Sequence, residues 1–213
     1  MYVLAPNQSV EKYPYTIGQL RRDNPNTSFP RNPSSETLAH FGVYPVTRKD
    51  RPEHDDITQT VTEDQPKFVS GKWQQAWTVS DASAEQVEQR KAQRRQAIND
   101  ERDRRLAGDF TFADAQFQRD AVSVQRITGA ATLAGFAVAN GAQPGNLRWH
   151  GGDTDFAWIA SDNTLVTMDA QTCLQFGQAC ANVETRLIFA AKALREMEPI
   201  PRDFADDGYW PDA

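Results

Sequence analysis

The chain has 213 residues, enough for one large domain or two small ones. Its formal net charge is −6, and the segment 196–213 holds six acidic residues against one basic residue. Because affinity for nucleic acid rests on neutralising phosphates with Lys and Arg, this balance argues against a nucleic-acid-binding protein. We expect no signal peptide and no membrane insertion, since the N-terminus lacks a basic region followed by an apolar stretch and no apolar run reaches the length of a bilayer span.

Residues 1–56 hold seven of the twelve prolines. Proline lacks a backbone donor and restricts the residue before it, so we expect little regular structure here. A capping-box pattern at Thr16 and Gln19 predicts one short helix over 17–23, and a second is predicted over 36–41. Such a segment has little core of its own. It is therefore predicted to be an extended arm that lies on another surface.

Residues 57–79 are predicted to form a β-hairpin with its turn at Ser70-Gly71. Trp73 and Trp77 fall on the same face of the return strand, because side chains alternate between the two faces. Two interpretations stay open for this pair. It forms a small core under the hairpin, or it is a platform on which a sugar stacks.

The segment 81–107 is predicted to be a long charged helix that ends at Gly108. Acidic and basic residues interleave along it, and its apolar stripe is thin. Mixed charge of this kind is typical of a solvated face with weak ion pairs. A helix connecting two modules, or one that belongs to a bundle of several subunits, is the alternative.

A short aromatic hairpin or turn over 110–117 is predicted next, followed by a helix from Asp120 to about Ala139. Small residues in this helix would let another helix approach closely. Strands are then predicted within 147–168, beginning with a short one at Leu147–Trp149.

The last helix is predicted over 170–197, capped by Asp169. Its apolar positions alternate in steps of three and four, which is the period of a coiled-coil seam. The seam belongs either to a bundle within one chain or to an interface between subunits. Cys173 and Cys180 lie about 10 Å apart along this helix, too far for a disulfide. The candidate interface residues are Cys173, Phe176, Cys180, Val183, Leu187, Ala190, Leu194 and Met197, with Tyr209 and Trp210 from the tail.

The acidic tail after the last helix keeps three aromatic residues, Phe204, Tyr209 and Trp210. A disordered tail rarely retains so many aromatic side chains. We therefore expect it to dock on a neighbouring surface.

No catalytic, cofactor or metal site is predicted. The three histidines show no metal-ligand spacing, and no nucleophile elbow, phosphate-binding loop or dinucleotide fingerprint occurs. The string from His150 to Asp155 is the most site-like, because its glycines expose amides and its two aspartates suit a hard cation. It lacks the later acidic ligand of a calcium loop, so a plain loop is expected.

Two patterns between residues 88 and 120 together carry a family resemblance. Their residues are Arg95, Ile98, Arg102 and Asp103, then Phe110, Phe112, Phe117 and Asp120. With the hairpin over 156–168 and the long helix after it, they resemble a phage domain of otherwise unknown function, over roughly residues 85–198. The resemblance implies a tail-fibre or tail-assembly setting and no catalytic residues. The N-terminal string YPYTIGQLRRDNPNTSFP also resembles the start of phage tail-associated proteins.

These observations predict an α+β protein in four parts. They are a Pro-rich attachment arm with a β-hairpin (1–80), a connecting helix (81–108), an α+β module of two helices and short hairpins (109–198) and an acidic aromatic tail (199–213).

The predicted function is that of a non-enzymatic structural component of a phage tail, made in the host cytoplasm and located in the virion. Other tail or baseplate proteins and further copies of the chain are the expected partners, without nucleic acid or cofactor. One alternative is a tail-fibre assembly chaperone that is absent from the mature virion. A second is a fibre-borne protein that binds or hydrolyses polysaccharide.

Overall fold

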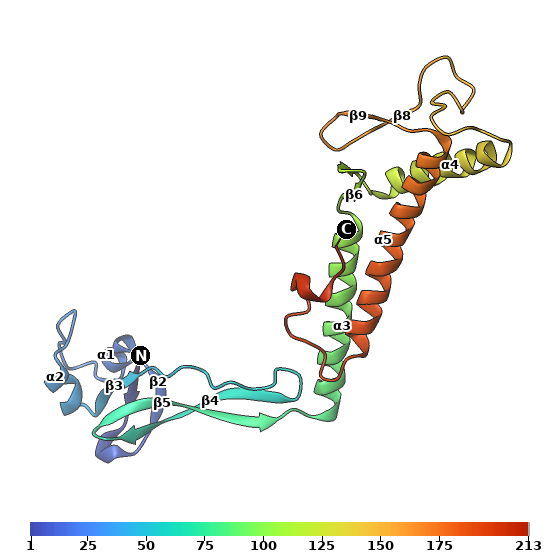
Figure 1. Ribbon diagram of the computed structural model, residues 1–213. Coiled ribbons are helices and arrows are strands. Elements are labelled where there is room, and N and C mark those ends of the chain that lie inside the picture. Colours follow the sequence, from blue (N-terminus) through green and yellow to red (C-terminus); the bar gives the residue numbers. More distant parts are fainter. Residues whose placement is uncertain (213) are drawn as a thin grey trace. The chain divides into compact units, whose positions relative to one another are not determined.

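The computed structural model describes residues 1–212 and confirms an α+β protein. The chain forms two compact units, Met1–Glu88 and Gln89 onward. The boundary between them falls inside helix α3 (Ala84–Leu106). Each unit has its own elements and its own buried side chains (Figure 1).

Unit 1 is built on a five-stranded sheet with the strand order β2-β1-β3-β5-β4. The pairing of β3 with β5 is parallel and the other pairings are antiparallel. Its elements are β1 (Tyr2–Leu4), η1 (Pro6–Gln8), β2 (Lys12–Tyr15), α1 (Ile17–Asp23), α2 (Ser35–His40), β3 (Val43–Thr47), β4 (Gln59–Val69) and β5 (Lys72–Asp81).

The expectation of an extended arm with little core is wrong for residues 1–56. Tyr15, Leu20, Leu38 and Val43 are buried together, and a second cluster joins Val3 and its neighbours to β5. These apolar residues are scattered along the sequence and show no local period. They converge only because β1 lies between β2 and β3, which is a long-range arrangement.

The two short helices and the hairpin of unit 1 are confirmed. Thr16 and Gln19 form the predicted capping box of α1, and the cap of α2 is Ser34. At the tip of the β4–β5 hairpin, Ser70 and Gly71 both have positive φ, 50° and 79°. Two such residues make the turn whose twist matches that of the strands.

The two tryptophans of β5 belong to the structure of unit 1. Trp73 is buried with Val3, Ala5 and Val46. Trp77 is half-buried and donates a hydrogen bond from Nε1 to the Lys49 carbonyl over 3.1 Å. An exposed stacking platform made of both rings is therefore excluded. The core interpretation is confirmed for Trp73, whereas Trp77 is half-buried and is not part of that cluster.

Unit 2 begins in α3 and packs α3 and α4 against α5, with two small hairpins at one end (Figure 1). Its remaining elements are β6 (Phe110–Phe112), β7 (Ala115–Phe117), α4 (Ala121–Ala139), β8 (Ala157–Ile159), β9 (Leu165–Thr167), α5 (Ala170–Glu196) and η2 (Asp207–Tyr209). All three predicted helices and both predicted hairpins are present. The predicted strand at Leu147–Trp149 is wrong, because those residues form a turn.

Local caps explain where the helices of unit 2 begin. The Asp120 carboxylate accepts hydrogen bonds from the amides of Val122 and Ser123 at the start of α4. The Asp169 carboxylate accepts one from the Thr172 amide at the start of α5. Both satisfy amides that a helix leaves without an intrahelical partner.

Candidate interaction surface

An aromatic cluster anchors the hairpins of unit 2 to α5. Phe176 lies at its centre, and its ring centroid is 5.3 Å from Phe110, 5.4 Å from Phe112 and 4.7 Å from Phe117. Trp158 of β8 contacts the same ring at 5.4 Å. The backbone joins the two hairpins as well, since the Ser161 amide donates to the Gln116 carbonyl over 2.8 Å.

The predicted seam of α5 is occupied inside the chain. Of its eight positions, six are buried: Cys173, Phe176, Cys180, Val183, Leu187 and Leu194. Ala190 is half-buried, and the neighbouring Ala191 is buried in its place. Met197 is 40% exposed. The seam therefore serves the bundle within one chain, which was the first of the two interpretations.

The acidic tail docks on α3, within the same unit. Lys91 pairs with Glu198 over 2.9 Å. Arg105 pairs with Asp207 over 2.7 Å, and its guanidinium lies over the Trp210 ring at 5.0 Å from the centroid. Trp210 is 6% exposed, so the tail buries its largest side chain. Tyr209, also predicted at an interface, remains partly exposed.

A buried arginine closes the C-terminal end of α3. Arg119 donates from Nη2 to the Arg105 carbonyl over 2.7 Å and from Nε to the Gly108 carbonyl over 3.3 Å. These carbonyls belong to the end of the helix and the residues after it, where partners for backbone oxygens are scarce. Burial lowers the pKa of the guanidinium. Arg119 also lines a pocket of about 450 Å³ between α3, α4 and α5, which Asp103, Asp120 and Glu184 line too.

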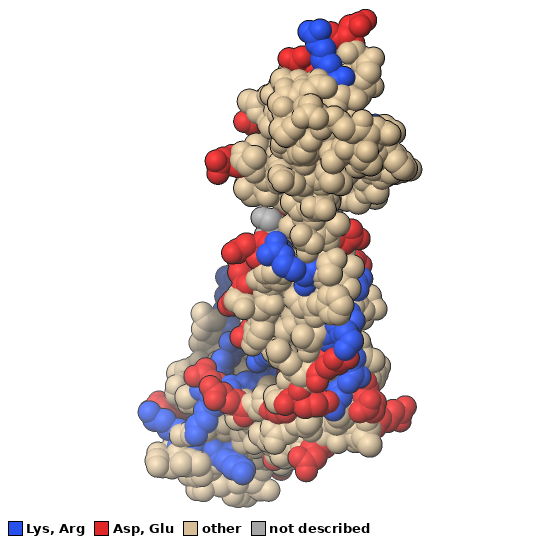
Figure 2. All heavy atoms as spheres, turned by 45° about the vertical axis from the view of Figure 1, so that its right-hand side comes forward, with Lys and Arg blue, Asp and Glu red and all other residues tan. Residues whose placement is uncertain are grey.

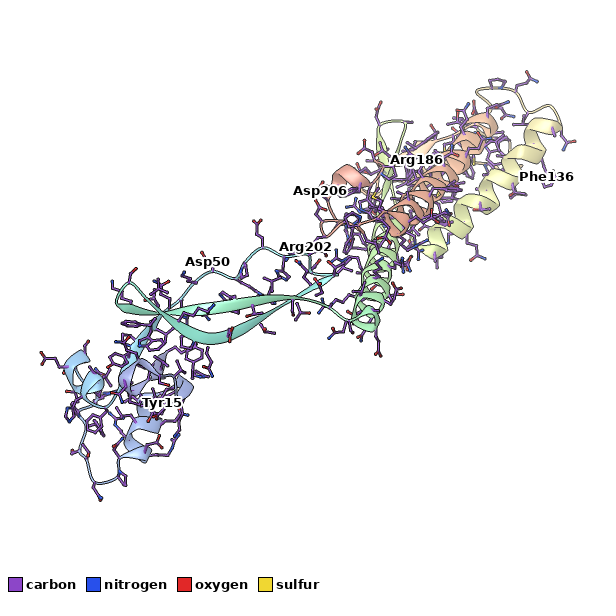
Figure 3. All side chains as sticks on the ribbon, turned by 90° about the horizontal axis from the view of Figure 1, so that it is seen from below. Tyr15, Asp50, Phe136, Arg186, Arg202 and Asp206 are labelled. Atoms are coloured by element: carbon purple, nitrogen blue, oxygen red, sulfur yellow. The ribbon has the colours of Figure 1, made fainter. Side chains whose placement is uncertain are left out.

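Helix α4 has one side packed on α5 and the other side open. Ile127 and Ala134 are buried, and a Cβ placed on Gly177 of α5 would lie only 2.3 Å from the Ala131 Cβ. The two helices thus approach closely, as the small residues predicted. On the opposite side, Leu133 is 63% exposed and Phe136 is 64% exposed. Figure 3 shows Phe136 projecting from the side of α4 away from α5.

The open side of α4 belongs to an apolar helix. Arg126 is its one charged residue, and the helix is long and apolar enough to cross a membrane by length and composition. The expectation that no apolar run reaches such a length is therefore wrong for α4. Ile127 and Ala134 are the residues of α4 that are fully buried in the chain. The sequence predicted the helix and its close approach to another helix, but a periodic pattern does not show which of two apolar faces finds a partner.

Further apolar side chains are exposed close to α4. Ile159 and Leu165 are cross-strand neighbours in the β8–β9 hairpin, and both are exposed. Ile159 lines the same pocket as Ser123 and Arg126 of α4. In unit 2, Figure 2 shows a broad uncharged surface over the part where Figure 1 has α4 and the hairpins. The charged side chains gather instead along α3.

The loop predicted as the most site-like is held by its own contacts. His150 bonds the Thr154 carbonyl through Nε2 over 3.0 Å, and Arg148 pairs with Asp155 over 3.3 Å. Among residues 1–212, no three or more His, Cys, Asp or Glu side chains gather in an arrangement that suits a metal ion.

A family model matches residues 89–207, from the start of unit 2 to η2. It is described as a domain of unknown function, DUF4376. The chain belongs to the DUF4376 family. The match begins at the same residue as unit 2, so the DUF4376 domain includes most of α3 and the tail as far as Asp207, but not Trp210. No curated protein and no solved structure matches the chain.

Proposed function

We propose that this protein is a non-enzymatic component of a bacteriophage tail that acts by binding other proteins. The observation that carries the proposal is the open side of α4, where Leu133 and Phe136 are more than half exposed. Large exposed apolar patches on a folded protein mark interaction sites, because burying them in a complex removes apolar area from water.

The phage setting rests on the family. DUF4376 domains are commonly phage-associated, and the aromatic and charged patterns of residues 88–120 resemble those of tail-fibre and tail-assembly proteins. Unit 1, with its separate core, is the module we assign to attachment on a tail or baseplate partner. Unit 2 carries the exposed apolar surface for further assembly.

Mass spectrometry of purified particles of the encoding phage tests this proposal. A virion component is expected in the particles at a fixed ratio to the major tail proteins. Detection in the lysate but not in the particles would favour the alternative, a tail-fibre assembly chaperone that leaves before maturation.

The polysaccharide alternative is tested separately. Purified protein would be incubated with host capsule or cell-wall material, and released reducing sugar would be measured. We expect no release. The buried position of Trp73 removes the paired-tryptophan platform that had motivated this alternative.

A further inference from the structure

The guanidinium of Arg119 keeps one nitrogen without a partner. Its Nε and Nη2 donate to the Gly108 and Arg105 carbonyls at the end of α3. The third nitrogen, Nη1, is buried and makes no hydrogen bond within residues 1–212. Arg119 as a whole is 2% exposed. Because buried donors without a partner are costly and few in folded proteins, the chain leaves a place for an acceptor at Nη1.

The unbonded nitrogen belongs to a pocket. Nε and Nη2 share one edge of the planar guanidinium, and α3 occupies that edge, so Nη1 points away from it. Arg119 lines the pocket of about 450 Å³ between α3, α4 and α5. Glu184 of α5 lines the same pocket, and its charge acts on the guanidinium. The two groups make no ion pair with each other, so they are further apart than a direct contact.

Glu184 differs from the other carboxylates of this pocket. Asp103 pairs with Arg102 over 2.7 Å, and Asp120 accepts hydrogen bonds from the first amides of α4. Within the part of the chain that the structure describes, no hydrogen bond or ion pair holds the Glu184 carboxylate. The pocket therefore contains one unbonded donor and one unbonded acceptor, and their charges are opposite.

The pocket leads from an exposed rim to a buried floor. Asp103 at the rim is exposed. Leu106, Val124 and Glu184 are half-buried. Arg119 is buried. The walls between rim and floor are thus largely apolar, and the polar groups lie deeper. Such a lining suits a group with a hydrocarbon stem and a polar end, because a few convergent polar groups in an apolar pocket fix the orientation of what binds.

We propose that this cavity, the Arg119 pocket, binds the side-chain amide of a glutamine from a partner protein. The amide oxygen accepts a hydrogen bond from Arg119 Nη1, and the amide nitrogen donates one to the Glu184 carboxylate. A primary amide carries both functions on one planar end. The amide is neutral, as is the sum of the Arg119 and Glu184 charges. Its two-carbon stem lies against Leu106 and Val124.

Other side chains fit the Arg119 pocket less well. A carboxylate would satisfy Arg119, but it would repel the nearby charge of Glu184. A lysine ammonium would satisfy Glu184, but it would leave Nη1 without an acceptor and place a second cation beside it. An apolar side chain would leave both groups unbonded, which is costly in a buried site. The amide is the one among these groups that satisfies both.

The Arg119 pocket is separate from the open side of α4. Leu133 and Phe136, which carry the proposed function, are not among its lining residues. The inference deepens the proposed function, and rests on it in so far as the glutamine belongs to a partner protein. The two fail separately. A chain that binds the amide and is absent from phage particles contradicts only the virion role, and a virion component that does not bind it contradicts only the pocket.

NMR titration of the full ¹⁵N-labelled chain with blocked tripeptides tests the proposal. The probe is N-acetyl-Ala-Gln-Ala-N-methylamide, in which the central side chain is the one primary amide. We expect it to bind with a dissociation constant on the order of millimolar. It should shift the backbone signals of Leu106 and Val124 and the Nε signal of Arg119. Peptides with Glu, Lys or Met at the centre are expected to bind at least about tenfold more weakly, since each loses a hydrogen bond to a charged group.

The variant Glu184→Gln should change the preference rather than abolish binding. Its new amide can donate to a ligand carboxylate from one side while Arg119 donates from the other. We expect this variant to bind the Glu peptide about tenfold more tightly than the wild type does, and the Gln peptide more weakly. A misfolded variant cannot gain affinity, so this exchange of preference is independent of any loss of stability.

Glu196→Gln is the matched control, because it removes a 62% exposed carboxylate from the same helix. It is expected to keep the wild-type preference. A wild-type chain whose signals do not move with about 50 mM Gln peptide overturns the proposal, since millimolar affinity would fill the pocket there. So does a wild-type chain that binds the four peptides equally or prefers Glu or Lys. Shifts confined to residues outside the pocket overturn it as well.

Discussion

The ring of Phe117 meets the ring of Phe176 edge-on, with 4.7 Å between centroids and 64° between planes. Both side chains are fully buried, and they come from different elements, β7 and α5. Edge-to-face contacts of this kind stabilise beyond the burial of area alone. Because Phe110 and Trp158 also contact Phe176, this single residue fixes both hairpins to the long helix.

Replacing Phe176 by alanine should therefore strongly destabilise unit 2. We expect Phe176→Ala to lower the free energy of unfolding by about 3–5 kcal/mol, the cost of removing a buried ring and leaving a cavity. Urea unfolding followed by tryptophan fluorescence measures it. Phe189→Ala on the same helix removes a ring that is 64% exposed and should change the free energy by less than about 0.5 kcal/mol. Equal effects of the two changes would contradict the central role of Phe176.

Two glycines of unit 2 should respond in opposite ways to alanine. A methyl group on Gly177 would collide with Ala131, so Gly177→Ala should lower the free energy of unfolding by about 1–3 kcal/mol. Gly129 has open space around it, and Gly129→Ala should raise the stability of the monomer by about 0.5–1 kcal/mol. Thermal unfolding at submicromolar concentration compares them. If both substitutions changed the free energy of unfolding in the same direction, the packing of α4 on α5 would differ from the one described.

The cap of α5 should make unit 2 sensitive to acid. The Asp169 carboxylate accepts hydrogen bonds from the Gly145 amide over 2.7 Å and the Thr172 amide over 2.8 Å, and these bonds lower its pKa. A lowered folded pKa means that the stabilisation is complete above the unfolded pKa of about 4 and is lost as pH falls through the folded value.

Asp169→Ala should accordingly cost about 1 kcal/mol at neutral pH. The difference from wild type should shrink when unfolding is measured at successively lower pH, below about 4. Asp153→Ala, which removes an exposed carboxylate, is the control and should leave stability unchanged. If the difference in free energy of unfolding between wild type and Asp169→Ala grew as the pH fell, the carboxylate of Asp169 would not be the stabilising form, and the prediction would be wrong.

Both thiols should be inert in the folded protein. Burial raises the pKa of Cys173 to about 11 and also raises that of Cys180. Because the thiolate is the reactive form, neither should react with 5,5′-dithiobis(2-nitrobenzoate) in the native state at about pH 8. In denaturant both should react at once. Rapid release of the coloured thionitrobenzoate from the native protein would show that the side of α5 that carries Cys173 and Cys180 is not buried.

Trp210 should hold the tail on α3. Its Nε1 donates to the Phe204 carbonyl over 2.7 Å, and Arg105 lies over its ring. Trp210→Ala should expose the segment 198–212 to limited proteolysis, with cleavage sites located by mass spectrometry. Tyr209→Ala removes a partly exposed neighbour and should leave the tail protected. Equal protection of the Trp210 variant would mean that the ion pairs alone keep the tail in place.

Elements with a local signal could be predicted from the sequence. The cap at Asp169, the turn at Ser70-Gly71 and the small residues of α4 each act within a few residues, and the structure has them as expected. The sheet of unit 1 could not be predicted, because its short strands β1 and β3 are stabilised by pairing with each other and with β2 and β5, which is a long-range arrangement. The open face of α4 was missed for a related reason. Its residues are as apolar as those of the buried face, and only the packing of α5 on one side decides which face is buried.

The docked tail makes α3 depend on residues that are synthesised more than 100 positions after it. Lys91 and Glu198 are paired across 107 positions of sequence, and Arg105 is paired with Asp207 across 102. Until the segment after Glu196 has left the ribosome, the face of α3 that these residues cover stays in water. A chain interrupted before Glu198 would therefore expose part of α3 and the side of α5 next to it, as a target for proteases. The packing of α3 is thus completed only once a segment more than 100 positions further along the chain has been made.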